Sequence, residues 1–220
     1  MEETAIAPPR PATKVWLAAE FLALFFGVVG VYALFGSPGS PIPFLLVGGV
    51  AAYVYLRRQA GFERRDLTRA AAVPAALPAI LAGWALAAVV GIVVLAVARP
   101  EQLFDLPREE PLIWAFVAVF YPLLSVYPQE LIYRAFLLHR YAPLLGTGAW
   151  AAAASATAFG FAHVIFGNVL SVLLTLAGGW LFARRYQKTR SLLAVSVEHA
   201  LYGVLAFTIG FGDLFYHGAR

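Results

Sequence analysis

The chain alternates between long apolar stretches and short polar ones. The apolar stretches cover roughly residues 15–35, 42–56, 73–98, 111–140, 148–167, 169–186 and 191–211. They are continuously apolar rather than alternating in polarity, which favours helices over the strands of a β-barrel. Several approach the ~20 residues that a helix needs to cross a bilayer. The pattern predicts an all-α, polytopic transmembrane helical bundle of about seven spans, of which the fourth contains two prolines and could be broken.

Composition agrees with a membrane protein. Of 220 residues, 61% are hydrophobic and only 13% are charged, whereas soluble domains carry about 25% charged residues. Residues 1–14 are polar and Pro-rich and predict a disordered N-terminal tail. Residues 15–220 predict one transmembrane domain, with no room for a separate soluble domain. The first apolar stretch is longer than the core of a signal peptide, so it is interpreted as a retained span.

The basic residues predict the orientation in the membrane. The 57–69 segment carries five Arg, the 184–190 segment carries four Lys or Arg, and the 99–110 segment has two Arg against four acidic residues. Basic loops stay on the cytoplasmic side, so seven spans place the N-terminus in the cytoplasm. The net charge of +4 is explained by this topology, and no nucleic-acid partner is expected. The expected surroundings are membrane lipid, in the inner membrane of a bacterium.

Ionisable side chains occur inside these apolar stretches, where they are costly and normally face the bundle interior. Glu130 and Arg134 lie in the fourth stretch, His163 in the fifth, and Glu198 with His199 in the seventh. Glu20, near the start of the first stretch, is an isolated further case. The three late groups predict one polar site, within residues 111–211, assembled from three helices.

Local spacing suggests how the first group is held. Pro128 suits the first turn of a helix, which would place Gln129 and Glu130 near the end of the helix dipole that favours a carboxylate. Glu130 and Arg134 are four residues apart and therefore share a helix face on which they can pair. Alternatively, these two residues could form a purely structural ion pair. Either histidine, taken alone, could likewise be a packing residue with no functional role.

Two chemistries fit a site of carboxylate and imidazole groups. One group can accept a proton from water while another stabilises the developing oxyanion. Alternatively, Glu130, His163 and His199 could bind zinc with an open fourth position. No HExxH motif is present, so no cofactor is expected and zinc is the weaker alternative.

At these positions the chain resembles the CAAX prenyl endopeptidase and bacteriocin-processing (Abi, or CPBP) family of intramembrane glutamic proteases. The family's E-E-x-x-x-R motif corresponds to Q-E-L-I-Y-R, residues 129–134. Its F-x-x-x-H motif corresponds to Phe159 to His163. Its H-x-x-x-N motif corresponds to His199 to Gly203. The order and spacing cover roughly residues 110–210.

The resemblance implies an intramembrane endopeptidase that cuts a membrane-associated peptide or protein near the cytoplasmic side. In the family the first Glu and the motif-two His activate water, the motif-three His and Asn hold the oxyanion, and the Arg braces the second Glu. Carried over, His163 is the water-binding His, His199 an oxyanion donor, and Glu130 with Arg134 the bracing pair. Gln129 and Gly203 depart from the motifs, because an amide cannot act as a general base and glycine has no side-chain donor.

These departures leave alternatives open. Glu130, or less favourably Glu198, could serve as the working carboxylate. A catalytically degenerate relative could instead bind a membrane peptide or protein partner in the same cavity, and a small transporter is a third possibility. The simple spans also place His163 about 22 Å from the cytoplasmic end of its helix at 1.5 Å per residue, deeper than Glu130 and His199. Convergence therefore requires a displaced or tilted fifth helix.

Overall fold

The computed structural model describes residues 11–36 and 39–215, and every regular element in these ranges is helical. The longer helices are α1 (Pro11–Leu22), α2 (Val28–Leu34), α3 (Ile42–Arg58), α4 (Ala72–Ala98), α6 (Pro111–Tyr121), α10 (Ala149–Ala162), α11 (Val169–Thr189) and α12 (Leu192–Ile209). The shorter ones are α5 (Asp105–Glu109), α7 (Tyr127–Glu130), α8 (Leu137–Arg140), α9 (Ala142–Leu145) and single helical turns at Arg64–Leu67, Pro100–Gln102, His163–Phe166 and Gly212–Leu214. The all-α prediction is confirmed, and each predicted apolar span contains a helix.

Five helical segments are long and apolar enough to cross a membrane. They are Thr13–Leu34, Ala72–Ala98, Pro111–Arg140, Ala149–Phe166 and Leu192–Ile209. Helices α3 and α11 are not among them, so the number of spans and the cytoplasmic N-terminus remain predictions. Large apolar side chains cover the outside of α4, including Val89, Val93 and Val97. Exposed apolar surface of this extent suits acyl chains rather than water.

The N-terminal tail was predicted to end at residue 14. Residues 1–10 lie outside the described part of the chain, whereas α1 already begins at Pro11. The last four residues of the predicted tail are therefore helical.

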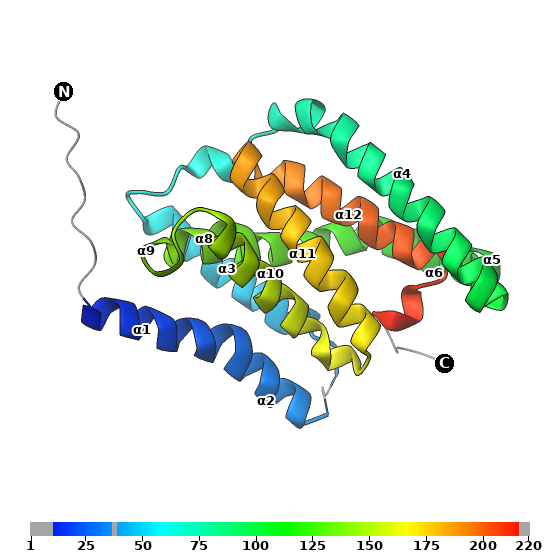
Figure 1. Ribbon diagram of the computed structural model, residues 1–220, viewed down its shortest axis with the longest axis horizontal. Helices are drawn as coiled ribbons and strands as arrows, with labels where there is room; N and C mark the ends of the chain where they lie inside the picture. The colour runs from blue at the N-terminus through cyan, green and yellow to red at the C-terminus, as the bar shows by residue number, and fades with distance from the viewer. Residues whose placement is uncertain (1–10, 37–38, 216–220) are drawn as a thin grey trace.

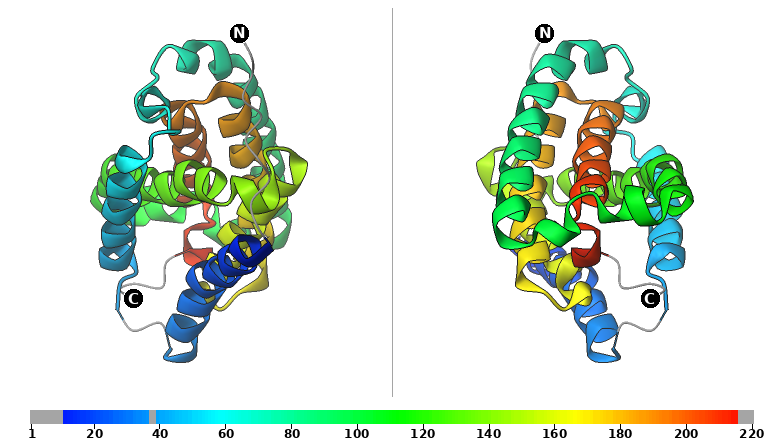
Figure 2. Two further views of the ribbon diagram at one scale, coloured as in Figure 1. Left: turned by 90° about the vertical axis from the view of Figure 1, so that its left-hand side faces the viewer. Right: turned by 90° about the vertical axis from the view of Figure 1, so that its right-hand side faces the viewer.

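Helices α10 and α11 pack against each other, and α12 lies between α11 and α4 (Figure 1). The α1–α2 segment lies along the edge opposite α4, as the side views also show (Figure 2). Small residues let α10 and α11 approach closely, because a Cβ atom at Gly179 would lie only 3.0 Å from the Cα atom of Ala156. The small residues of α10 and α11 thus allow close helix packing.

The helix from Pro111 to Arg140 is continuous, although two prolines lie inside it. Wide π-helical turns at Pro122–Val126 and Leu131–Phe136 flank α7. Proline cannot donate a backbone hydrogen bond, and its ring crowds the preceding turn. A locally widened turn accommodates both effects without a break. The expectation that a helix begins at Pro128 is therefore wrong, and Glu130 lies in the middle of a long helix.

Glu20 is not isolated, because it ties the first span to the end of α8. Arg140 donates from Nε and Nη2 to the two Glu20 carboxylate oxygens at 2.9 and 2.8 Å, and the Tyr141 hydroxyl donates to Oε1 at 2.9 Å. The Arg140 guanidinium also lies 5.7 Å from the ring centre of Tyr55 on α3. This cluster joins α1, α3 and α8 at one point.

Candidate active site

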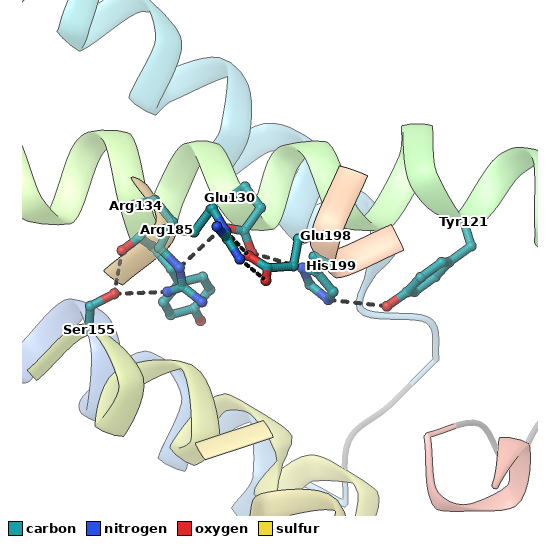
Figure 3. A network of polar contacts seen from close by, with 8 residues as sticks. Tyr121, Glu130, Arg134, Ser155, Arg185, Glu198 and His199 are labelled. Atoms are coloured by element: carbon teal, nitrogen blue, oxygen red, sulfur yellow. Dashed lines mark hydrogen bonds and ion pairs between the residues drawn. The ribbon is translucent and has the colours of Figure 1, made fainter. Parts of the chain in front are cut away.

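Glu130 is the centre of a buried polar network (Figure 3). Its side chain has no exposed surface and contacts two partners on opposite sides. Its Oε2 atom lies 3.1 Å from Arg134 Nε, one turn further along the same helix. Its Oε1 atom lies 2.8 Å from His199 Nδ1 on α12. The predicted contact between Glu130 and Arg134 is therefore present, and Glu130 also contacts the helix of the seventh apolar segment.

His199 has one ring nitrogen toward Glu130 and the other toward Tyr121. An ionised carboxylate only accepts hydrogen bonds, so His199 Nδ1 carries the proton that it shares with Glu130. In the neutral imidazole Nε2 is then an acceptor, and the Tyr121 hydroxyl, 3.2 Å away, donates to it. The structure thus places a carboxylate, an imidazole and a phenol in one chain of hydrogen bonds, with Glu130 fixing the tautomer of His199.

Aromatic rings hold the His199 imidazole in its plane. The Phe182 ring stacks on it at 4.6 Å between centroids and 20° between planes. The Phe159 ring contacts it edge-on at 5.4 Å. His199 is only 6% exposed, so packing as well as hydrogen bonding limits its orientation.

Arg134 is fully buried and joins the site to α10. Its Nη1 donates to Ser155 Oγ at 2.8 Å, and Ser155 in turn donates to the backbone carbonyl of Tyr133 at 2.7 Å. Its guanidinium lies 4.8 Å from the ring centre of Phe159. A buried cation needs such partners, since leaving it unpaired would cost several kcal/mol.

The two departures from the motifs have different structural consequences. Gln129 donates from Nε2 to Ser125 Oγ at 2.7 Å, one turn earlier on the same helix, and makes no hydrogen bond to Glu130 or His199 among the described residues. Gly203 is packed directly against Tyr121, and a Cβ atom there would overlap the Tyr121 ring. The space beside His199 is thus occupied by a side chain from α6.

His163 does not join the network directly. Its Nδ1 donates to the Phe159 carbonyl at 2.8 Å, and the Phe159 ring contacts both imidazoles, at 4.8 Å for His163 and 5.4 Å for His199. Within the described residues it has no hydrogen bond to Glu130 or His199. Helix α10 meets the site through Ser155 and Phe159, one to two turns before His163. The sequence placed His163 deeper along its helix than Glu130 and His199 lie along theirs. The structure agrees, because α10 contacts the network with residues that precede His163.

Glu198 points away from the network into a separate ion pair. Arg185 Nε and Nη2 on α11 donate to its two carboxylate oxygens, both at 2.9 Å. Its carboxylate therefore has both oxygens committed to one guanidinium. Successive residues of a helix project about 100° apart, which explains why Glu198 and His199 serve different contacts.

A metal site would need three or more suitable ligands close together. The described residues contain no group of three His, Asp or Glu side chains placed to hold a metal ion. Of the three residues considered for zinc, Glu130 contacts His199, whereas His163 is hydrogen-bonded to the Phe159 carbonyl; zinc binding stays a prediction that no observation tests.

Comparison with known proteins identifies the segment that contains this network. Residues 109–205 match the family model of type II CAAX prenyl endopeptidase Rce1-like proteins. This match supports the family that the three motifs suggested. The match covers all three motif positions and confirms the resemblance noted in the sequence. Neither a curated protein nor a solved structure gives a significant match.

The family match supports a function of the CAAX-type intramembrane protease kind. It also agrees with the apolar helices in indicating an integral membrane protein in contact with lipid. The family match does not favour the alternative of a purely binding role. Two contributors to the network, Tyr121 and Ser155, were not predicted. Gly203 indicated only that space was left where the family has Asn; that Tyr121 fills this space follows from the packing of α6 against α12.

Proposed function

We propose that this chain is an intramembrane endopeptidase that hydrolyses a membrane-associated peptide with water activated at His199 and Glu130. The observation that supports this most directly is the 2.8 Å contact between His199 Nδ1 and Glu130 Oε1, inside the segment that matches the family. A carboxylate that orients an imidazole leaves the far ring nitrogen unprotonated and therefore able to take a proton. The proposed site needs no carboxylate at position 129.

The proposed reaction uses His199 Nε2 as the base. Water attacks the peptide carbonyl carbon while one of its protons passes to Nε2, and the carbonyl π electrons move to oxygen to form a tetrahedral oxyanion. When this intermediate collapses, the carbon–nitrogen bond breaks and His199 returns the proton to the leaving amine. Glu130 stabilises the imidazolium through Nδ1, and Arg134 prevents Glu130 from taking the proton. The products are an amine and a carboxylic acid, and the acid then releases its proton to water to become a carboxylate.

The test uses purified protein in liposomes with fluorogenic peptides anchored by an isoprenyl or an acyl chain. We expect cleavage of at least one anchored peptide by the natural chain. His199→Ala should lower kcat by about 10²–10⁴, the range of general acid–base contributions. Undiminished cleavage by His199→Ala would place the base elsewhere.

Peptide binding without cleavage is a second candidate function, because Gln129 departs from the family's motif. Saturable peptide binding without cleavage, unchanged on addition of divalent metal ions, would indicate a binding protein. Reporter fusions to the predicted 57–69 and 99–110 loops in a bacterial host would test the proposed orientation in the cytoplasmic membrane.

A further inference from the structure

We infer that Tyr121 supplies the side-chain hydrogen-bond donor that position 203 lacks, and this inference rests on the proposed function. The family motif places an Asn four residues after its histidine, whereas this chain has Gly203. A missing donor would leave the oxyanion of the intermediate poorly stabilised. The hydroxyl of Tyr121 reaches the same side of His199 from a different helix.

Packing explains why the donor comes from position 121. A Cβ atom at Gly203 would overlap Cε1, Cζ and the hydroxyl oxygen of the Tyr121 ring. Any larger residue at 203 is therefore incompatible with the observed position of Tyr121. Conversely, removal of the Asn side chain opens the space into which this ring fits. The two positions thus form a matched pair across the α6–α12 interface.

The direction of the Tyr121 hydroxyl is suited to the role. It lies 3.2 Å from His199 Nε2, the atom proposed to take the proton from water. Its ring is held edge-on to Phe207 at 5.6 Å and to His199 at 6.1 Å, so the hydroxyl is aimed by packing (Figure 3). Without substrate its proton is shared with Nε2. When a water molecule donates to Nε2 in place of Tyr121, the Tyr121 hydroxyl can donate to the substrate carbonyl oxygen.

The chemistry of this step is a hydrogen bond and not a proton transfer. Tyr121 keeps its proton throughout, and the negative charge that develops on the former carbonyl oxygen accepts from the O–H group. A preorganised donor of this kind strengthens as charge develops, so it acts on the transition state more than on bound substrate. Its removal should therefore lower kcat and leave KM nearly unchanged.

The experiment compares Tyr121→Phe with the natural chain, with Tyr202→Phe as the matched control. Tyr202 precedes Gly203 on α12, and its ring packs against Phe182 at 6.1 Å; its hydroxyl is outside the network. We expect Tyr121→Phe to lower kcat by about 10²–10³, the usual cost of one oxyanion donor, without change in KM or thermal unfolding temperature. Tyr202→Phe should retain the natural rate.

A second pair of variants tests the exchange between positions. Tyr121→Ala removes both ring and hydroxyl, and the double variant Tyr121→Ala, Gly203→Asn returns a donor from α12. We expect the double variant to cleave at least about tenfold faster than Tyr121→Ala, consistent with restoring part of one donor's contribution.

The outcomes separate the two proposals. If Tyr121→Phe cleaves within about threefold of the natural rate, the role of Tyr121 is overturned, because one donor is expected to contribute far more. The same holds if the double variant is no faster than Tyr121→Ala. Neither result affects the proposed function. A natural chain that cleaves no anchored peptide overturns the proposed function and the role of Tyr121 with it.

Discussion

Glu130 and Glu198 are both buried glutamates on helices of the same bundle, and each is paired with an arginine. They differ in how their oxygens are used. Arg185 takes both oxygens of Glu198 in a two-pronged contact, whereas Glu130 divides its oxygens between Arg134 and His199. Only Glu130 is therefore connected to a group that can carry a proton.

The surroundings of the two arginines differ as well. Arg134 is entirely buried and is held further by Ser155 and by the face of Phe159. The Arg185 side chain keeps 15% of its surface exposed. A buried carboxylate within an apolar helix therefore does not by itself indicate a proton-transfer site; the partner of its second oxygen does.

The largest expected difference between the two glutamates is in cleavage. Glu130→Gln removes the negative charge that stabilises the His199 imidazolium, so we expect the cleavage rate to fall by about 10²–10⁴. Glu198→Gln is the matched control and should stay within about threefold of the natural rate, since it lies outside the proton path. Rates are measured with anchored peptide in liposomes. The reverse order of effects would transfer the catalytic role to Glu198.

The next effect concerns stability. Arg134→Met leaves Glu130 without its cation in a fully buried position, and such uncompensated charges typically cost about 3–5 kcal/mol. Arg185→Met should cost less, because solvent can reach part of the Glu198 pair and weaken its contribution. Denaturant unfolding in detergent micelles, followed by tryptophan fluorescence, measures both. Equal losses would mean that the difference in exposure has no energetic consequence.

The smallest expected effect is at His163. Because His163 is hydrogen-bonded to the Phe159 carbonyl and not to Glu130 or His199 in the described residues, we expect His163→Ala to lower kcat by about tenfold at most, less than the general-base contribution proposed for His199. His163→Gln provides a control that retains hydrogen-bonding capacity to the Phe159 carbonyl. A loss as large as that of His199→Ala would indicate that water is activated at His163 and that the Phe159 ring moves during the reaction.

Much of this arrangement could be predicted from local sequence. Continuous apolar stretches predicted the helices, and the i,i+4 spacing predicted the contact between Glu130 and Arg134. Helical periodicity also accounts for the different directions of Glu198 and His199, which are adjacent in the sequence. These features depend on neighbours within one or two turns of a single helix, for which the geometry is fixed.

The remaining features depend on how helices meet. Tyr121 and Gly203 are complementary only when α6 lies against α12, and no spacing within either segment reveals this. Arg185 was interpreted only as part of a basic loop that sets the orientation. Its partner, Glu198, is on another helix, so the sequence did not reveal the ion pair. The position of His163 followed from which residues of α10 contact Arg134, a matter of tertiary packing.

The π-helical turn at Leu131–Phe136 has a consequence for the whole bundle. In a regular α-helix, at about 100° per residue, positions 130 and 140 would project only about 80° apart. One inserted residue in the widened turn moves them to nearly opposite faces, at about 180°. Glu130 can then meet α12 while Arg140 meets Glu20 on α1. Deleting a single residue from this turn would therefore prevent the helix from keeping both the contact of Glu130 with His199 and the contact of Arg140 with Glu20.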